Sequence, residues 1–209
     1  MSRCVILSAA PVSDISALRD LLCPDDTFIA ADGGWKLAER LGVALSAIVA
    51  DFDSSSLPSL PDSVEIVRLP VRKDCTDTAA AVEYALKKGY SDFLLLGCVG
   101  GRLDHQYAAT QLLVQLAEMG LHAVMADGEN RISAVTSSPY VADPMPGWSL
   151  SLFAFDGTVH GLSIRGASYE LTDYDLQPAD PLCVSNAAES TPCEITFTDG
   201  TLLVFRSKD

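Results

Sequence analysis

The chain has 209 residues, of which 48% are hydrophobic and 20% charged, a composition typical of folded globular proteins rather than disordered chains. Its formal net charge of −14 argues against a surface that binds nucleic acid or an anionic membrane, because such surfaces concentrate basic residues. An acidic chain can still bind a nucleotide when a metal ion neutralises the phosphates. No apolar run reaches the roughly 18 residues of a membrane helix, and no targeting segment is visible, so we expect a cytoplasmic protein.

The first two thirds of the chain alternate short apolar runs with segments of helical periodicity. Parallel strands that are buried on both faces typically read as such continuous apolar runs. The expected strands are Cys4–Leu7, Thr27–Ala31, Ala47–Asp51, Val64–Leu69, Asp92–Leu96 and His122–Ala126. The expected helices are Asp14–Leu22, Trp35–Leu41, Thr76–Lys88 and Leu103–Met119. This alternation predicts an α/β domain with a mostly parallel sheet and helices on both of its faces.

The pattern changes at Ser137, where a segment rich in Ser and Pro shows no helical period. Short strands are expected beyond it, at Ser149–Phe155, Thr158–Ile164, Ser168–Leu171, Leu182–Ser185, Glu194–Thr198 and Thr201–Arg206. The last two flank Asp199–Gly200, a dipeptide that favours a type I′ hairpin turn. We therefore predict an α/β domain over residues 1–136 and a small antiparallel β-sandwich domain over residues 137–209.

The six cysteines and three histidines show no spacing typical of a metal site. None of the cysteines forms a C-x-x-C pair, and several lie inside apolar runs. We therefore expect buried or half-buried free thiols, rather than a disulfide framework or a zinc centre.

Aspartates follow several of the predicted strands and open one predicted helix. These residues are Asp32, Asp51, Asp53, Asp74, Asp77 and Asp104. Ligands of open α/β sheets bind beyond the carboxyl ends of the strands, so we expect these carboxylates to converge on one edge of the sheet. Carboxylates beside Gly-rich turns suit a Mg²⁺–polyphosphate site, because hard oxygens hold the metal and backbone N–H groups hold the phosphates.

Each of these motifs taken alone also has a purely structural explanation. An Asp after a strand is often a turn former or a helix cap. The segment GCVGGR lacks the Gly-Lys-Ser/Thr of a P-loop and does not fit the dinucleotide-binding fingerprint. The prediction of a nucleotide site therefore depends on all four clusters, spaced across one α/β domain.

Four blocks in this order, ADGGW, ADFDS, KDCTDTAAAVEYAL and GCVGGRLDH, resemble the signature blocks of the thiamin pyrophosphokinase family. The segments GLSIRGASYELTDYDL, VSNA and EITFTDGTLLV resemble the β domain of the same family. The resemblance implies an enzyme that transfers a diphosphate group from ATP to the hydroxyl of thiamin, with Mg²⁺ as cofactor. It also implies a homodimer whose sites lie between two subunits.

This interpretation assigns catalytic roles to acidic and basic residues of the blocks. Asp51, Asp53 and Asp77 are expected to hold one or two Mg²⁺ ions. Lys73 and Arg102 are expected to stabilise charge on the transferred group and on the departing AMP. Either Asp77 or Asp53 would accept the proton of the attacking hydroxyl, and the sequence does not choose between them.

A second set of residues is predicted to bind ATP or thiamin. On the nucleotide side it comprises Asp32, Gly33, Gly34, Thr76, Gly100, Gly101 and His105. The resemblance alone implies that Asp104 binds the aminopyrimidine of thiamin. It also implies that Ser185 and Asn186 of the β domain line the thiamin pocket.

The chain departs from the family pattern at four positions, none of which removes a core aspartate: Trp35, Ala50, Ala79 and Ala187. Three other functions are therefore kept open. The first is diphosphate transfer to another hydroxymethyl heterocycle such as a pterin, which is neutral where thiamin is a cation. The second is an aspartyl-phosphate phosphatase, although that class carries its D-x-D motif on the first strand. The third is a nucleotide-binding module without catalytic activity.

Overall fold

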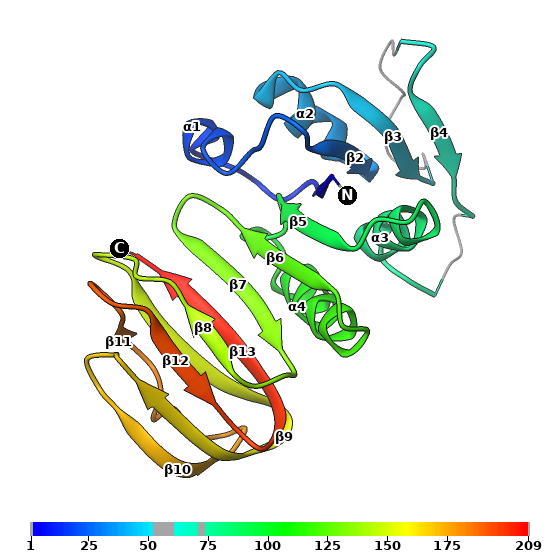
Figure 1. The fold of residues 1–209 in the computed structure, drawn as a ribbon. Helices are drawn as coiled ribbons and strands as arrows, with labels where there is room; N and C mark the ends of the chain where they lie inside the picture. Colours follow the sequence, from blue (N-terminus) through cyan, green and yellow to red (C-terminus); the bar gives the residue numbers. More distant parts are fainter. Residues whose placement is uncertain (1, 52–60, 71–73, 209) are drawn as a thin grey trace. The chain divides into compact units, whose positions relative to one another are not determined.

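The structure is a computed structural model that describes residues 2–51, 61–70 and 74–208 (Figure 1). The chain forms two compact units. One unit contains Met1–Leu112 and Leu121–Gly128, and the other contains Leu113–Gly120 and Glu129–Asp209. Among the described residues, no helix is long and apolar enough to cross a membrane.

The first unit contains a parallel sheet with the strand order β4-β3-β2-β1-β5-β6. Its strands are β1 (Cys4–Leu7), β2 (Thr27–Ala31), β3 (Leu45–Ala50), β4 (Glu65–Arg68), β5 (Asp92–Leu96) and β6 (His122–Ala126). The chain runs outward from β1 to β4 and then returns to the other side of β1 to form β5. Such a reversal leaves a crevice outside the carboxyl ends of the two central strands, which is where open α/β sheets bind ligands.

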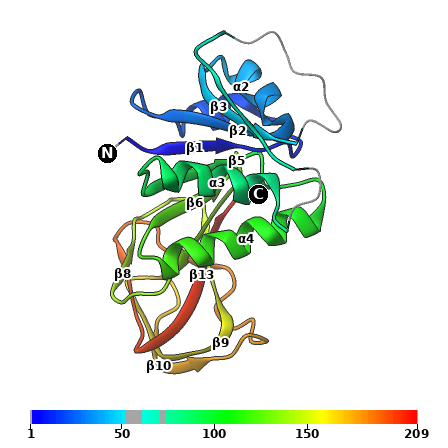
Figure 2. The same cartoon turned by 90° about the vertical axis from the view of Figure 1, so that its right-hand side faces the viewer.

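Helices cover both faces of this sheet, as predicted (Figures 1 and 2). They are α1 (Ile15–Arg19), the 3₁₀ turn η1 (Asp32–Gly34), α2 (Trp35–Leu41), α3 (Asp77–Lys87) and the first part of α4 (Leu103–Glu118), whose residues from Leu113 onward belong to the other unit. Val5 and Leu7 of β1 share a core cluster with residues of α1 and α2. Because side chains alternate along a strand, Cys4 and Ile6 are buried on the opposite face.

The second unit is an antiparallel β structure in which one long strand joins two sheets (Figure 1). Its strands are β7 (Asn130–Val135), β8 (Tyr140–Ala142), β9 (Ser149–Arg165), β10 (Leu171–Leu176), β11 (Asn186–Ala187), β12 (Cys193–Thr196) and β13 (Asp199–Ser207). The first half of β9 pairs with β13 and β11, and its second half pairs with β10 and β12. Leu150 and Leu152 from the first half share one core cluster with Leu162 and Ile164 from the second. The predicted α/β domain with an added β-sandwich is therefore confirmed.

Several predictions for the second unit are wrong in detail. Ser149–Phe155 and Thr158–Ile164 form a single strand, in which Gly157 adopts a φ of 143° instead of starting a turn. Leu182–Ser185 forms a turn rather than a strand, and the predicted strand Ser168–Leu171 lies almost entirely before β10.

The hairpin predicted at Asp199–Gly200 is also wrong. Strand β12 pairs with β8 and β9, whereas β13 pairs with β7 and β9. Asp199 and Gly200 are themselves the first residues of β13. The two strands that the dipeptide joins are therefore partners of β9 and not of each other.

Strand β7 was not predicted, and it belongs to the second unit because all six of its residues pair with β13. The boundary expected after Thr136 and the roles expected for the two domains remain predictions.

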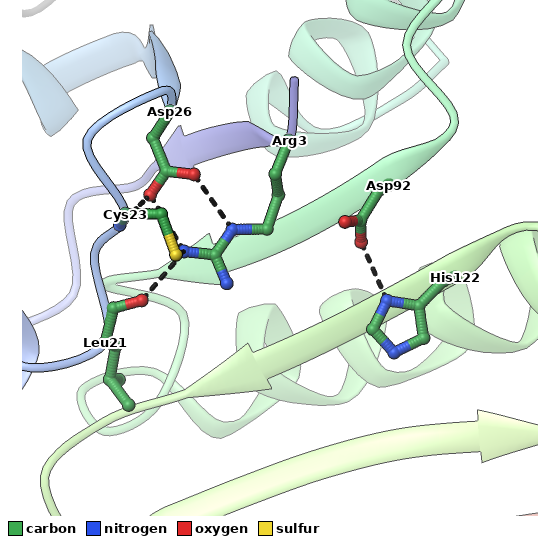
Figure 3. A network of polar contacts seen from close by, with 6 residues as sticks. All are labelled: Arg3, Leu21, Cys23, Asp26, Asp92 and His122. Carbon is green, nitrogen blue, oxygen red and sulfur yellow. Dashed lines mark hydrogen bonds and ion pairs between the residues drawn. The ribbon is translucent and has the colours of Figure 1, made fainter. Parts of the chain in front are cut away.

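An ion-pair network holds the amino-terminal edge of the parallel sheet together (Figure 3). Arg3 donates from Nε to Asp26 Oδ1 at 3.0 Å and from Nη2 to Asp26 Oδ2 at 2.8 Å. The same Nη2 donates to the carbonyl of Leu21 at 2.7 Å, and the Cys23 N–H donates to Asp26 Oδ2 at 2.8 Å. The side chain of Asp26 is only 1% exposed, so Arg3 neutralises a buried carboxylate, and this contact raises the pKa of Arg3.

Candidate functional site

A cavity of about 860 Å³ lies where the strand order of the first unit reverses. Its walls come from the segments that follow β1, β2 and β5 and from the start of α3. The lining residues are Ser8, Ala9, Ala10, Pro11, Ala31, Asp32, Asp74, Cys75, Thr76, Asp77, Thr78, Gly97, Cys98, Gly100, Gly101, Arg102, His105 and Ala109. The volume falls within the range of roughly 300–1,000 Å³ that is typical of small-molecule sites.

Three of the aspartates that were predicted to converge at one edge of the sheet line this cavity: Asp32, Asp74 and Asp77. Asp32 begins η1 in the left-handed region with a φ of 46°, a conformation that Asp tolerates better than most residues. Its Oδ1 atom is buried and has no hydrogen-bond partner within residues 2–51, 61–70 and 74–208. A buried acceptor without a partner is destabilising by roughly 1–3 kcal/mol, so this oxygen does not stabilise the fold and remains available to a ligand.

The start of α3 is fixed in place at the edge of the cavity. Thr76 caps the helix by accepting the Ala79 N–H on Oγ1 at 3.2 Å. Ser8, which follows β1, and Thr78 share a hydroxyl–hydroxyl hydrogen bond of 2.8 Å. The backbone that carries Asp77 is therefore tied both to its own cap and to the loop after β1.

The glycine-rich loop after β5 needs its glycines for conformational reasons. Gly100 and Gly101 have φ values of 84° and 71°, in the region that disfavours residues with a side chain. A Cβ on Gly101 would lie 3.0 Å from Pro11 Cδ. The Gly100 N–H donates to Gln106 Oε1 at 3.2 Å, so its predicted contact with a phosphate stays a prediction.

Two cationic or titratable residues of the predicted set, Arg102 and His105, also line the cavity. Arg102 forms a two-point contact with Asp104, from Nε to Oδ1 at 3.1 Å and from Nη2 to Oδ2 at 2.6 Å. The guanidinium lowers the pKa of Asp104 to about 2, so this carboxylate stays ionised at any physiological pH. The predicted contact of Asp104 with an aminopyrimidine remains a prediction.

The structure does not place three of the predicted metal-binding or phosphate-binding residues in the lining of this cavity. Asp51 is half-buried and directly follows β3, and it does not belong to the described lining of the cavity. Asp53 and Lys73 fall outside the described residues. Within residues 2–51, 61–70 and 74–208, no group of three or more His, Cys, Asp or Glu side chains is arranged to hold a metal ion.

The two residues predicted to bind thiamin in the second unit are engaged by their own chain. Ser185 has a φ of 60°, and its N–H donates to Ser151 Oγ at 3.0 Å. Asn186 is buried, and its side-chain amide bonds to both peptide groups of Tyr169. Asn186 also lines a cavity of about 170 Å³ in this unit.

Comparison with known proteins identifies the family. The family model described as "Thiamin pyrophosphokinase, catalytic domain" matches residues 18–125. A second model, "Thiamin pyrophosphokinase, vitamin B1 binding domain", matches residues 142–202. The chain belongs to the thiamin pyrophosphokinase family. The resemblance inferred from the sequence blocks is therefore confirmed.

One curated relative and several solved structures are similar to the chain. The chain is 28% identical over 138 residues to thiamine pyrophosphokinase of Bacillus subtilis (strain 168), a match that spans 66% of this chain and 64% of that protein. The crystal structure of Bacillus subtilis thiamine pyrophosphokinase superimposes with a TM-score of 0.89 at 24% identity over 100% of both chains. The Candida albicans thiamin pyrophosphokinase superimposes with a TM-score of 0.78 at 14% identity over 99% of this chain and 90% of that one. The structural matches show a shared fold.

One wall of the cavity was not predicted from the sequence blocks that resemble the family. Residues 8–11, which follow β1, line the site, but they lie before the first of the blocks. The signal that could have revealed them is topological, because β1 is one of the two strands at the reversal of the sheet.

Gly33 and Gly34 allow a test that separates packing from ligand binding. A Cβ on Gly34 would lie 1.8 Å from the carbonyl oxygen of Leu7, whereas a Cβ on Gly33 would lie 3.3 Å from the Cβ of Ala9. We expect Gly34→Ala to lower the free energy of unfolding by about 3 kcal/mol and Gly33→Ala by less than about 1 kcal/mol, as measured by urea denaturation. A Gly34→Ala protein that unfolds like the wild type but fails to bind ATP would instead place Gly34 in the nucleotide site.

Proposed function

We propose that the protein transfers the diphosphate group of ATP to the hydroxyl of thiamin and releases AMP. The observation that carries the proposal is the buried Oδ1 of Asp32, which has no hydrogen-bond partner in the described part of the chain. It lies in a cavity that Asp74 and Asp77 also line at the reversal point of the sheet. Family membership supplies the identity of the two substrates, and the match of the vitamin B1 binding domain to residues 142–202 favours thiamin over a pterin.

The residues of this cavity suit Mg²⁺. Carboxylate oxygens are the protein ligands that Mg²⁺ prefers, and the ion is usually held by one or two of them together with substrate phosphates and water. A site of this kind does not require three protein ligands in one cage. We infer that Asp32 and Asp77 would hold the ion, joined by Asp51 and Asp53 as the family resemblance implies. When bound, the ion neutralises negative charge on the phosphates.

The chemical step requires positioning and charge stabilisation rather than a covalent intermediate. The hydroxyl oxygen of thiamin forms a bond to the β-phosphorus while the bond from that phosphorus to the bridging oxygen of AMP breaks. Arg102, with Lys73, stabilises the charge on the transferred group and on AMP. A carboxylate accepts the hydroxyl proton, and the candidates are Asp77, which lines the cavity, and Asp53, which the sequence blocks supply. His105, Thr76 and the glycine loop complete the nucleotide side of the site.

Two further parts of the proposal concern the molecule as a whole. The enzyme acts as a homodimer, and it acts in the cytoplasm. Sedimentation velocity of the purified protein tests the first of these.

The reaction is tested by measuring AMP release from ATP and Mg²⁺, with thiamin added or withheld. We expect AMP to appear only when thiamin is present, together with thiamin diphosphate. Thiamin-independent phosphate release would favour a phosphatase. AMP release revived only by other hydroxymethyl heterocycles would favour the pterin alternative, and no AMP with any acceptor would favour a nucleotide-binding module.

Cysteine labelling provides a test of nucleotide binding that does not depend on turnover. Cys23 and Cys75 are exposed, whereas the other four thiols are buried, and burial raises the pKa of Cys4 to about 12 and that of Cys98 to about 11. Cys75 lines the cavity, and Cys23 lies at the amino-terminal edge beside Arg3.

We therefore expect a thiol reagent to label only Cys23 and Cys75 in the native protein. ATP with Mg²⁺ should slow labelling of Cys75 in proportion to site occupancy and leave Cys23, the internal control, unchanged. Mass spectrometry of the labelled peptides reads out each site separately. Equal labelling of Cys75 with and without saturating nucleotide would show that the nucleotide does not bind in this cavity.

A further inference from the structure

A cluster of cationic side chains lies where β7 begins and its partner β13 ends (Figure 1). It consists of Arg131, Arg206 and Lys208, and the only other Lys or Arg between positions 129 and 208 is Arg165. The Lys208 N–H donates to the carbonyl of Glu129 at 3.0 Å, which continues the pairing of the two strands beyond β13. In a chain whose net charge is −14, such a cluster is a local site of attraction for anions.

Two of these cations face each other across the strand pair. Arg131 and Arg206 are direct partners in the antiparallel register, and Val135 and Val204 of the same strands belong to the core of the unit. Because side chains alternate along a strand, both arginines lie on the face that carries this core. Arg206 is only 7% exposed, and burial lowers the pKa of its guanidinium. Like charges directly opposite each other destabilise a strand pair, so this arrangement is unfavourable without a counter-ion.

Both guanidinium groups also retain a buried donor that is not used. Nε of Arg131 and Nη1 of Arg206 have no hydrogen-bond partner within residues 2–51, 61–70 and 74–208. Nη2 of Arg206 donates to the carbonyl oxygen of Asp143 at 2.5 Å, and this acceptor carries no formal charge. A buried cation is costly unless it is paired, and a bound anion would account for both unused donors.

The indole ring of Trp148 lies beside the two cations that an anion can reach from solvent. The Arg131 guanidinium lies 5.4 Å and the Lys208 ammonium 5.2 Å from the centre of this ring. Lys208 is exposed and Arg131 is half-buried, whereas Arg206 is buried. A contact between a cation and an aromatic ring is weak at an exposed site, while a charge-assisted hydrogen bond to phosphate is strong. An anion can therefore draw both side chains off the ring.

We propose that Arg131, Arg206 and Lys208 form a binding site for a tetrahedral oxyanion, either inorganic phosphate or the phosphate group of a monoester. Guanidinium groups match the spacing of phosphate oxygens, and two of them lie side by side here. The anion accepts hydrogen bonds from the unused donors and removes the repulsion between the two facing charges. None of the three residues lines the catalytic cavity, so the site is additional to the proposed function and does not depend on it.

The test titrates the full-length protein with inorganic phosphate at constant ionic strength, with chloride as the reference anion. The chain has two tryptophans, so a Trp35→Phe background leaves Trp148 as the fluorescent reporter of the site. Urea unfolding with and without phosphate provides a second readout. The variants are Arg131→Met and Arg131→Lys. Arg165→Met is the matched control, because it removes an exposed guanidinium of the same unit that is not part of the cluster.

We expect phosphate to change Trp148 fluorescence with a saturable curve and to raise the urea midpoint of the wild type. Arg131→Met should weaken phosphate binding at least about tenfold, yet raise the midpoint of the phosphate-free protein, because one of two facing charges is gone. Arg131→Lys should bind more weakly than wild type but more tightly than Arg131→Met, and Arg165→Met should stay within about twofold of wild type. A Trp148 response no larger with phosphate than with chloride, or an unchanged Kd in Arg131→Met, would overturn the proposal.

Two further arms identify the site and the anion. The catalytic cavity also contains a cation, so Arg102→Ala is titrated in parallel and should leave the response of Trp148 unchanged. A response that is lost in Arg102→Ala and kept in Arg131→Met would place the phosphate in that cavity and overturn the proposal. Glycerol phosphate is compared with inorganic phosphate. A lower Kd for glycerol phosphate assigns the site to a monoester, and a lower Kd for phosphate assigns it to the free ion.

Discussion

Asp32→Asn is expected to lower the kcat of thiamin-dependent AMP release by at least about a hundredfold while making the unliganded protein slightly more stable. Among the described residues, the buried Oδ1 of Asp32 has no partner, so the substitution replaces an unpartnered carboxylate oxygen by an amide of the same shape that costs less to bury. Loss of one group that stabilises charge in a phosphate-transfer site typically lowers the rate by about two to three orders of magnitude. Opposite changes in activity and stability are typical of residues retained for function.

The measurements are AMP formation at saturating Mg²⁺ and urea unfolding without ligand. Asp25→Asn is the matched control, because Asp25 is an exposed aspartate outside the lining of the main cavity, and it should leave both quantities unchanged. Asp77→Asn should reproduce the loss of activity. Near wild-type turnover in both Asp32→Asn and Asp77→Asn would show that the reaction takes place elsewhere.

Arg3→Met is expected to reduce the free energy of unfolding by about 3 kcal/mol without changing kcat per folded molecule. The substitution leaves the Asp26 carboxylate, whose side chain is 1% exposed, with the Cys23 N–H as its remaining contact among the bonds described above. Removing one partner of a buried ion pair typically costs about 3–5 kcal/mol, because the other charge stays buried. Arg3 directly precedes β1, whereas the cavity is lined by residues that follow β1, β2 and β5, so the chemistry should not change.

A double-mutant cycle distinguishes the loss of the pair from a loss of packing. Arg3→Met combined with Asp26→Leu removes both charges, and we expect it to be more stable than the sum of the two single losses predicts. Urea unfolding followed by fluorescence measures all four proteins. Additive losses would mean that the pair contributes nothing beyond the packing of its two side chains.

Where strands of the parallel sheet are continuous apolar runs, their first and last residues could be predicted from the sequence. The strands Cys4–Leu7, Thr27–Ala31, Asp92–Leu96 and His122–Ala126 have the predicted ends, because each contains an uninterrupted apolar run, which begins directly after a polar first residue in the last three. The antiparallel unit could not be predicted in this way. The turn signal at Asp199–Gly200 is local, whereas both β12 and β13 pair with β9, which ends at Arg165, well before β12 begins at Cys193.

The lining of the cavity was predictable where the position of a residue after a strand decides which edge of the sheet it occupies. Asp32 and Asp77 lie in one cavity because the ends of parallel strands and the helix that follows must meet at one edge of the sheet. The role of Gly34 was not predictable, since its closeness to the carbonyl of Leu7 depends on how η1 packs against β1. The same holds for Asn186, whose hydrogen bonds to Tyr169 join residues far apart in sequence.

The pairing of β13 has a consequence for biosynthesis. Residues Asp199–Ser207 pair with β7 on one side and with the first half of β9 on the other, so the strand between them is made after both of its neighbours. While the ribosome is still adding residues 166–198, the edges of β7 and β9 that will pair with β13 expose backbone groups that can associate with other chains. The strands of the parallel sheet, in contrast, are all synthesised by Ala126. Nascent chains arrested just before residue 199 should therefore contain a folded first unit and a second unit that depends on chaperones.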